Sequence, residues 1–272
     1  GETSNIVTVS MPDFNPVGER VEFVRNVSPS DPGETRTIEM TMVPKDGLPS
    51  TRGAVSFVQD VPQEARDTFA LGVKLLREGR TDESLASLQK AVSIFPDYFD
   101  ARFILAREFI RQRNFTEAIT QLDQARRINP KDDRVFQSFG IIMLQQQKYA
   151  VASRIFAEAS RLNPREPNHL MLQGTALIDQ ATTVDPTKSH AAADERNYAF
   201  SEAEKVLNRA YQLSGKKLAA VHLQMARLFE KKGDRARAAA ELEQYLRQSP
   251  DDKKAAEIRE AIKKLRAPSA PD

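Results

Sequence analysis

The sequence contains no cysteine among its 272 residues, only 11 glycines and no long uninterrupted apolar run. Without cysteine, the chain can form no disulfide, no thiolate nucleophile and no cysteine-based metal site. No apolar run reaches the about 18 residues that suggest a membrane-spanning helix, so no span is expected in this sequence. The glycines are scattered among expected turns and helix contacts, and they form no glycine-rich phosphate loop.

Motifs for catalysis and metal binding are also missing. His169, His190 and His222 lie far apart, and no HExxH-type spacing of metal ligands occurs. No nucleophile-elbow pattern supports Ser-His-Asp chemistry. The acidic pairs Asp132-Asp133 and Asp251-Asp252 stand at expected helix starts, where capping explains them. We therefore expect a protein that is not an enzyme and binds neither a cofactor nor a metal.

The charge balance does not demand a polyanionic partner. Lysine and arginine number 40 against 38 aspartate and glutamate residues. Basic residues do gather toward the C-terminal end, as Lys231, Lys232, Arg235, Arg237, Lys253, Lys254, Lys263 and Lys264. They alternate with acids and alanines on expected helices, which favours a solvated face over a nucleic-acid site.

A period of 34 residues organises the chain from Ala65 to Pro164, where Pro96, Pro130 and Pro164 close three segments of the same pattern. Bulky-small pairs recur, and further bulky and small residues follow at fixed distances. The recurring positions are Leu71-Gly72, Leu105-Ala106 and Phe139-Gly140, then Leu75, Phe109 and Met143, then Ser84, Ala118 and Ala152, then Leu88, Leu122 and Phe156, then Ala91, Ala125 and Ala159. A fixed period of this kind indicates a repeat array.

Each repeat is expected to be a pair of amphipathic helices, because its apolar residues recur at three and four positions. The small residues fall where two helix axes approach to about 8 to 10 Å, and a side chain larger than alanine at Gly140 is expected to force them apart. The proline ends the second helix. Gly79 and Gly233 suit left-handed helix ends, and Asn114 followed by Glu117 has the spacing of a capping box.

This pattern resembles the tetratricopeptide repeat (TPR), in which a large residue and glycine are followed by an aromatic residue, alanine, a large residue, alanine and proline. The resemblance implies a mainly α fold, a right-handed solenoid of helical hairpins. Units are expected at 65–98, 99–132, 133–166 and 219–252, with a fourth unit between them interrupted by an insertion at 179–197. The insertion is interpreted as a polar loop followed by an extension of the second helix. Residues 61–266 would thus hold five units and a C-terminal capping helix, and 267–272 a disordered tail.

Residues 1–60 follow another pattern. Asn5–Val9, Val21–Val27 and Thr37–Val43, with a candidate fourth run at Ala54–Val58, are apolar or β-branched runs separated by turn formers. They predict a small antiparallel β segment ahead of the helices. This domain order resembles bacterial extracytoplasmic proteins with a carboxypeptidase regulatory-like domain before TPRs. The resemblance implies a periplasmic or membrane-anchored location. The start at Gly1 rather than Met suggests that the true N-terminus has been removed, and a signal peptide or lipid anchor could have been part of it.

By the same TPR resemblance, the first helix of each pair lines a concave groove that binds a peptide or a helix of another protein. The predicted peptide-binding residues are Phe69, Phe103, Arg107, Arg111, Gln137, Ile141, Met171 and Arg227. Aromatic and arginine side chains are enriched among binding hot spots. Phe69 and Val73 stand where one TPR subclass has a Lys and Asn clamp for chaperone C-termini, which argues against that activity. The leading hypothesis is a non-catalytic protein-interaction scaffold.

Two rival functions belong to other classes. The basic C-terminal units could bind nucleic acid, which would need a continuous positive stripe with stacking aromatics, and Phe229 and Tyr245 are the aromatics nearby. The β segment could instead bind a ligand or a glycan.

Overall fold

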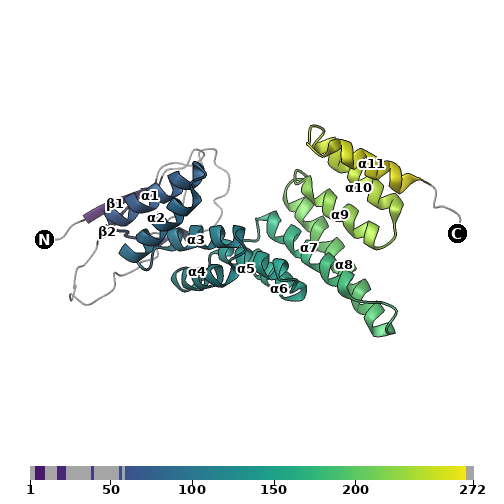
Figure 1. Cartoon of the computed structure of the whole chain (residues 1–272), viewed down its shortest axis with the longest axis horizontal. Coiled ribbons are helices and arrows are strands. Elements are labelled where there is room, and N and C mark those ends of the chain that lie inside the picture. Colours follow the sequence, from purple (N-terminus) through teal and green to yellow (C-terminus); the bar gives the residue numbers. More distant parts are fainter. Residues whose placement is uncertain (1–3, 10–16, 23–37, 40–54, 57–58, 268–272) are drawn as a thin grey trace. The chain divides into compact units, whose positions relative to one another are not determined.

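The computed structural model describes residues 4–9, 17–22, 38–39, 55–56 and 59–267 (Figure 1). The chain divides into two compact units, Gly1–Ala101 and Arg102–Asp272. The described residues contain eleven helices; most of them pair as helical hairpins, as the repeat pattern predicts, and the last is single. Within these residues, no helix is both long and apolar enough to cross a membrane.

The first unit contains short strands and the first helical hairpin. Strand β1 (Ser4–Val9) pairs antiparallel with β2 (Val17–Glu22), and β3 (Ile38–Glu39) pairs antiparallel with β4 (Val55–Ser56). The register of the first pair places Ser4 opposite Glu22 and Val9 opposite Val17. The second strand therefore begins earlier than the expected Val21, while residues 23–27 and most of the expected third run lie outside the described residues.

The first hairpin consists of α1 (Gln63–Arg77) and α2 (Thr81–Ile94). A small core forms where Val61, Ala65, Ala91, Tyr98 and Ala101 are buried together. The backbone N–H of Phe99 donates to Gln59 Oε1 at 2.9 Å, which ties the chain before α1 to the chain after α2. This core belongs to the first unit alone.

Helix α3 (Phe99–Arg111) begins in the first unit and continues into the second, which holds the remaining helices. These are α4 (Phe115–Ile128), α5 (Asp133–Gln145), α6 (Tyr149–Leu162), α7 (Pro167–Thr183), α8 (His190–Leu213), α9 (Ala220–Lys231), α10 (Arg235–Gln248) and α11 (Ala255–Arg266). Helix α5 packs along α6, α7 along α8, and α9 along α10. The helices thus pair in the order of the sequence.

The hairpin turns and helix starts follow local rules. Gly79 and Gly233 adopt φ of +78° and +79°, as the left-handed cap predicts. Arg113 and Gln147 stand at the position of Gly79 in the second and third repeats. They adopt the same left-handed conformation, with φ of 60° and 59°, although both carry a Cβ. Asn114 caps α4 by accepting from the Glu117 N–H, as the capping-box spacing predicts.

The two helices of a hairpin approach most closely at the small residue of each first helix. A Cβ built on Gly140 would lie 2.5 Å from Phe156 Cε1, and one on Gly174 would lie 2.6 Å from Leu207 Cγ. The prediction for Gly140 was therefore too permissive, because the buried Phe156 ring leaves no room even for the methyl group of alanine.

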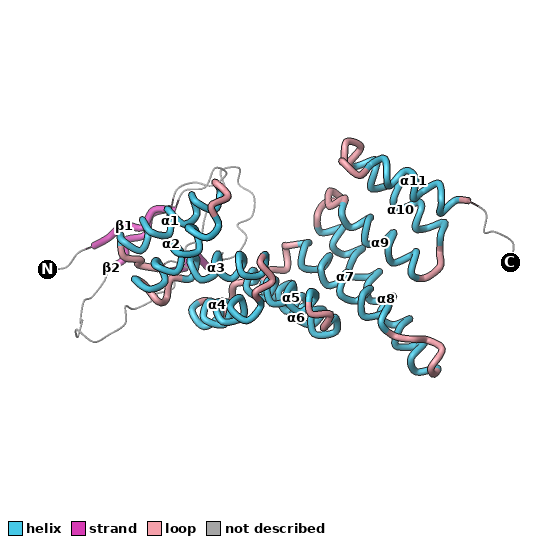
Figure 2. Tube along the Cα trace, viewed as in Figure 1, coloured by secondary structure: helices cyan, strands magenta, loops and turns pink. Residues whose placement is uncertain are grey.

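The fourth hairpin is longer than its neighbours. Helix α7 continues to Thr183 and α8 begins at His190, so only residues 184–189 connect the two helices as a loop. This loop is the pink segment beyond α8 at the lower right of Figure 2. The 179–197 stretch therefore contains a polar loop followed by the N-terminal part of α8, and its first residues, 179–183, also lengthen α7. Ser189 caps α8 by accepting from the Ala192 N–H at 3.1 Å.

The C-terminal helix α11 packs against α10, and Leu265 lies against the largest hydrophobic cluster of the second unit. Ala255 is buried, whereas Ile258 and Ile262 are half-buried. One amphipathic face is thus directed at the stack, which is the arrangement that a terminal repeat of a solenoid needs.

We expect Gly140→Ala to lower the free energy of unfolding. Alanine gains about 1 kcal/mol in helix propensity, but overpacking against Phe156 costs about 1–3 kcal/mol and should dominate. Urea unfolding of the variant measures the net change. A second substitution, Phe156→Leu, should recover much of the loss, because the preceding repeat has Ala106 and Leu122 at the same positions. A Gly140→Ala variant as stable as the parent would contradict this packing.

We expect Gln147→Gly to stabilise the third hairpin. A residue with a Cβ is strained by about 1–2 kcal/mol in the left-handed region, and glycine removes this strain. Glycine also increases the conformational entropy of the unfolded chain, which lowers the free energy of unfolding by about 0.4–1 kcal/mol. The net gain should be up to about 1 kcal/mol in urea unfolding. Gln145→Gly, in the helical last turn of α5, is the matched control and should instead destabilise.

Candidate functional site

The candidate site is the set of predicted residues on the first helices of the second unit, here called the first-helix surface. It comprises Phe103, Arg107, Arg111, Gln137, Ile141, Met171 and Arg227. On α3 the members are four residues apart, as are the two on α5, and this spacing places them on one side of a helix. The remaining predicted residue, Phe69, lies on α1 in the first unit.

The α3 part of the surface combines one covered ring with two exposed arginines. Phe103 is only 7% exposed, and the Arg134 guanidinium carbon lies 5.0 Å from the centre of its ring, in cation–π range. Arg111 is paired through Nε with Glu108 Oε2 at 2.8 Å. Arg107 is exposed and makes no ion pair or hydrogen bond within the described residues. Arg107 is therefore the available cation of this helix.

The α5 and α7 residues serve packing and surface together. Ile141 is half-buried against the cluster of Ala152, Phe156 and Ala176, and Met171 is half-buried against the larger cluster of the second unit. Gln137 is also half-buried. Each keeps part of its side chain accessible, so these residues offer a partly apolar surface.

Arg227 on α9 forms an ion pair with Asp179 on α7. The pair links two successive first helices, and the Asp179 side chain is 18% exposed against 41% for Arg227. Sequence reasoning missed Asp179 because it was counted in the expected insertion. The partners lie 48 residues apart, and no local pattern connects them.

In the first unit, Phe69 packs on Tyr98 with ring centroids 5.0 Å apart and lies half-buried against the core. The pKa of Tyr98 is raised, mainly because burial disfavours its phenolate. Phe69 therefore has a packing role in addition to any contact with a partner.

Two histidines are buried and paired with carboxylates from other helices. His169 is 1% exposed, with Nε2 2.7 Å from Asp133 Oδ2, and His222 Nδ1 lies 2.7 Å from Glu241 Oε2. His190 is exposed at the start of α8. The described residues contain no group of three or more His, Asp or Glu side chains placed to hold a metal ion.

Four of the eight basic C-terminal residues, Lys232, Arg235, Arg237 and Lys263, have side-chain partners within the described residues. Lys232 pairs with Glu204 at 3.1 Å, and Arg237 pairs with Asp234 at 2.5 Å. Phe229 is 3% exposed, and the Arg237 guanidinium carbon lies 4.3 Å from its ring centre. The Tyr245 hydroxyl donates to Asp252 Oδ2 at 2.6 Å, which keeps the pKa of Asp252 below its usual value. Neither ring is available for stacking on a base.

The repeated hairpins have the arrangement of TPRs, and two family models described as "Tetratricopeptide repeat" match residues 75–139 and 223–259. Among curated proteins, the chain is similar to the type IV pilus assembly protein PilF of Pseudomonas aeruginosa. The two are 28% identical over 142 residues, which cover 39% of this chain and 56% of PilF. The match thus spans little more than half the length of that relative.

Solved structures share the fold at low sequence identity. The type IV pilus biogenesis factor PilW matches with a TM-score of 0.60 and 16% identity, over 75% of this chain and 91% of PilW. PilF of Pseudomonas aeruginosa matches with 0.55 and 21%, over 76% and 94%. YrrB, described as a TPR protein with an unusual peptide-binding site, matches with 0.52 and 15%, over 72% and 92%.

We expect Asp133→Ala to destabilise the second unit by about 1–3 kcal/mol, because it removes the acceptor facing a buried histidine nitrogen. Asp133→Asn retains an oxygen acceptor and should cost less. Asp123→Ala is the matched control, since Asp123 is partly exposed and pairs with exposed Arg126; it should change stability by less than about 0.5 kcal/mol. Thermal unfolding compares the three. Equal losses for the alanine and asparagine variants would contradict a hydrogen-bonding role for Asp133.

Proposed function

We propose that this protein is a non-catalytic scaffold whose first-helix surface binds a peptide or helix of another protein. The observation that carries the proposal is the combination of exposed Arg107, which has no partner within the described residues, with half-buried Ile141 and Met171 on first helices of a TPR array. Arginine supplies directional hydrogen bonds, and partly exposed apolar side chains supply area that a partner can bury.

The roles of the predicted residues differ within this proposal. Arg107 and Arg111 would contact the partner directly. Gln137, Ile141 and Met171 would form the partly apolar surface on which the partner lies. Arg227 would contact the partner while its ion pair with Asp179 remains in place. Phe103 would contribute through the Arg134 guanidinium that covers its ring. Phe69, which belongs to the first unit, would make a separate contact with the partner.

The pilus proteins among the relatives support a more specific partner class. We propose that the partner is a protein of a cell-surface assembly and that the chain acts outside the bacterial cytoplasm.

The proposed domain organisation remains a β segment at 1–60, resembling a carboxypeptidase regulatory-like domain, followed by five units and a capping helix at 61–266. A ligand or glycan site on the β segment would involve residues that lie mostly outside the described part.

Nucleic-acid binding by the basic C-terminal units is the weaker alternative. Phe229 and Tyr245 are buried, and several of the cations are neutralised by carboxylates. A filter-binding assay at two salt concentrations tests it, because phosphate contacts make affinity fall steeply with salt. Salt-sensitive binding of RNA or DNA would favour this alternative over the scaffold.

The scaffold proposal predicts a charge-reversal effect at Arg107. Peptides selected by phage display on the full chain should bind Arg107→Glu about tenfold more weakly, equivalent to about 1.4 kcal/mol. Fluorescence anisotropy measures the affinity. The matched control is Arg127→Glu on α4, because Arg127 is likewise exposed and unpaired within the described residues. Equal affinity of the parent and both variants would place peptide binding elsewhere.

A further inference from the structure

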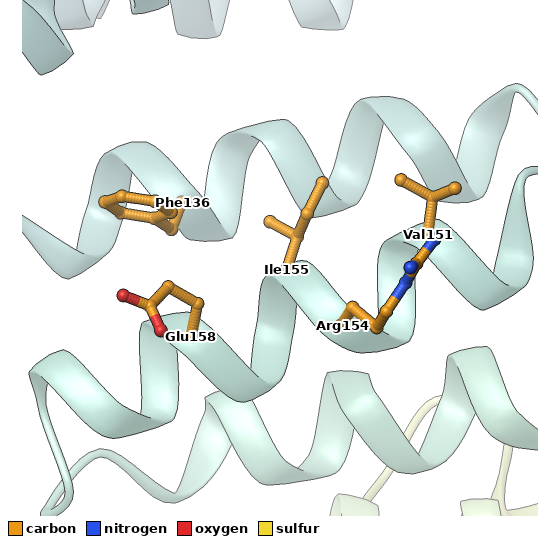
Figure 3. A pocket seen from close by; sticks show the side chains of 5 residues that line it. All are labelled: Phe136, Val151, Arg154, Ile155 and Glu158. Carbon is orange, nitrogen blue, oxygen red and sulfur yellow. The ribbon is translucent and has the colours of Figure 1, made fainter.

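An open hollow of about 350 Å³ lies on the third hairpin, between α5 and α6 (Figure 3). Phe136 lines it from α5, and Val151, Arg154, Ile155 and Glu158 line it from α6. The α6 residues stand at spacings of three and four, so they form one side of that helix. The volume is at the lower end of the range for ligand pockets and suits one or two side chains.

The floor of the hollow is apolar. Phe136, Val151 and Ile155 are each half-buried, whereas the neighbouring Ala152 and Phe156 are fully buried in the core of the hairpin. Figure 3 shows Ile155 projecting between Phe136 and Val151. The apolar floor thus remains accessible after the hairpin has packed its own core, and covering it would remove apolar surface from water.

The two charged residues at the edge differ in availability. Glu158 is held by Arg161, whose Nε and Nη2 lie 2.8 Å and 2.6 Å from its two oxygens. This bidentate pair keeps the pKa of Glu158 below its usual value, so the carboxylate stays ionised and engaged. Arg154 is exposed and makes no ion pair or hydrogen bond within the described residues. As far as the structure describes the chain, the hollow therefore offers one unpaired positive charge beside an apolar floor.

We propose that this hollow binds a large apolar side chain of a partner protein segment, with an adjacent carboxylate of that segment paired to Arg154. Most of the lining comes from α6, a second helix, so the site is separate from the first-helix surface and goes beyond the function proposed above. A carboxylate beside an apolar side chain matches the charge and the polarity of the lining together. A nucleic acid fits less well, because one available cation would face many phosphates and the apolar floor offers them no hydrogen bond.

Three small probes separate the two halves of this recognition. N-acetylphenylalanine carries both the ring and the carboxylate, its carboxamide carries the ring alone, and N-acetylglycine carries the carboxylate alone. Backbone amide shifts of the full chain in solution, followed at Phe136, Val151 and Ile155, report binding at the hollow. We expect N-acetylphenylalanine to bind about two- to fivefold more tightly than its carboxamide, because its carboxylate adds one partly exposed ion pair with Arg154. N-acetylglycine should bind most weakly.

Variants assign the effect to the named side chains. Arg154→Gln should abolish the preference for the carboxylate over the carboxamide, whereas Arg127→Gln, an exposed arginine on α4, should leave it unchanged. Val151→Gln should weaken both ring-bearing probes, and a thermal melt shows whether that variant is folded. If it is not, the Arg154→Gln comparison decides alone.

The proposal is overturned if N-acetylphenylalanine fails to shift these amides, or if Arg154→Gln retains the preference. Arg107→Glu serves as a cross-check, because it should leave probe binding at the hollow intact. The first-helix surface can therefore fail its own peptide test without affecting this result, and the reverse also holds.

Discussion

The close approach of two helices within each hairpin is the constraint on which the structure depends. In three hairpins a glycine on the first helix faces a large residue on the second, as Gly140 faces Phe156, and a Cβ on any of these glycines would overlap its neighbour. The contact sets the distance between the two backbones, so it also sets which side of each helix is buried. The sides left over are the ones available to a partner.

Repetition extends this local constraint along the chain. Each hairpin buries one side and offers another to the next hairpin, so stability is shared among neighbours. Interactions such as Asp179 with Arg227 and His169 with Asp133 add polar links between successive first helices. The links differ from hairpin to hairpin, whereas the glycine or alanine contact recurs. The recurring contact specifies the fold, and the polar links distinguish one interface from the next.

The helices were predictable from sequence because their signals are local. The 34-residue period, Gly79 and Gly233 at turns, and Asn114 at a helix start each act within a few residues. The long fourth hairpin was harder, since residues 179–183 continue a helix without the expected spacing. The partner of Asp133 was out of reach for another reason. His169 lies 36 residues away, and only the stacking of helices brings the two together.

The sequence indicated on which helices the candidate residues lie, but not how exposed their side chains are. The chosen residues do lie on first helices, since the repeat register determines that much. An aromatic residue on an amphipathic helix, however, has the same spacing whether it packs inward or faces a partner. Phe69 turned out to pack on Tyr98, and the ring of Phe103 is covered by Arg134. Neither covering residue is adjacent in sequence, so the pattern alone could not reveal it.

The third hairpin joins the two proposed surfaces through a single core. Ile141 of the first-helix surface packs against the cluster that contains Ala152 and Phe156, and Val151 and Ile155 of the hollow are their sequence neighbours on α6. A change in the volume of Ile141, Ala152 or Phe156 would disturb the packing of this cluster, because a close-packed core transmits strain. The exposed arginines lie outside this core. Substitutions of Arg107 and Arg154 are therefore the changes that can separate binding at one surface from binding at the other.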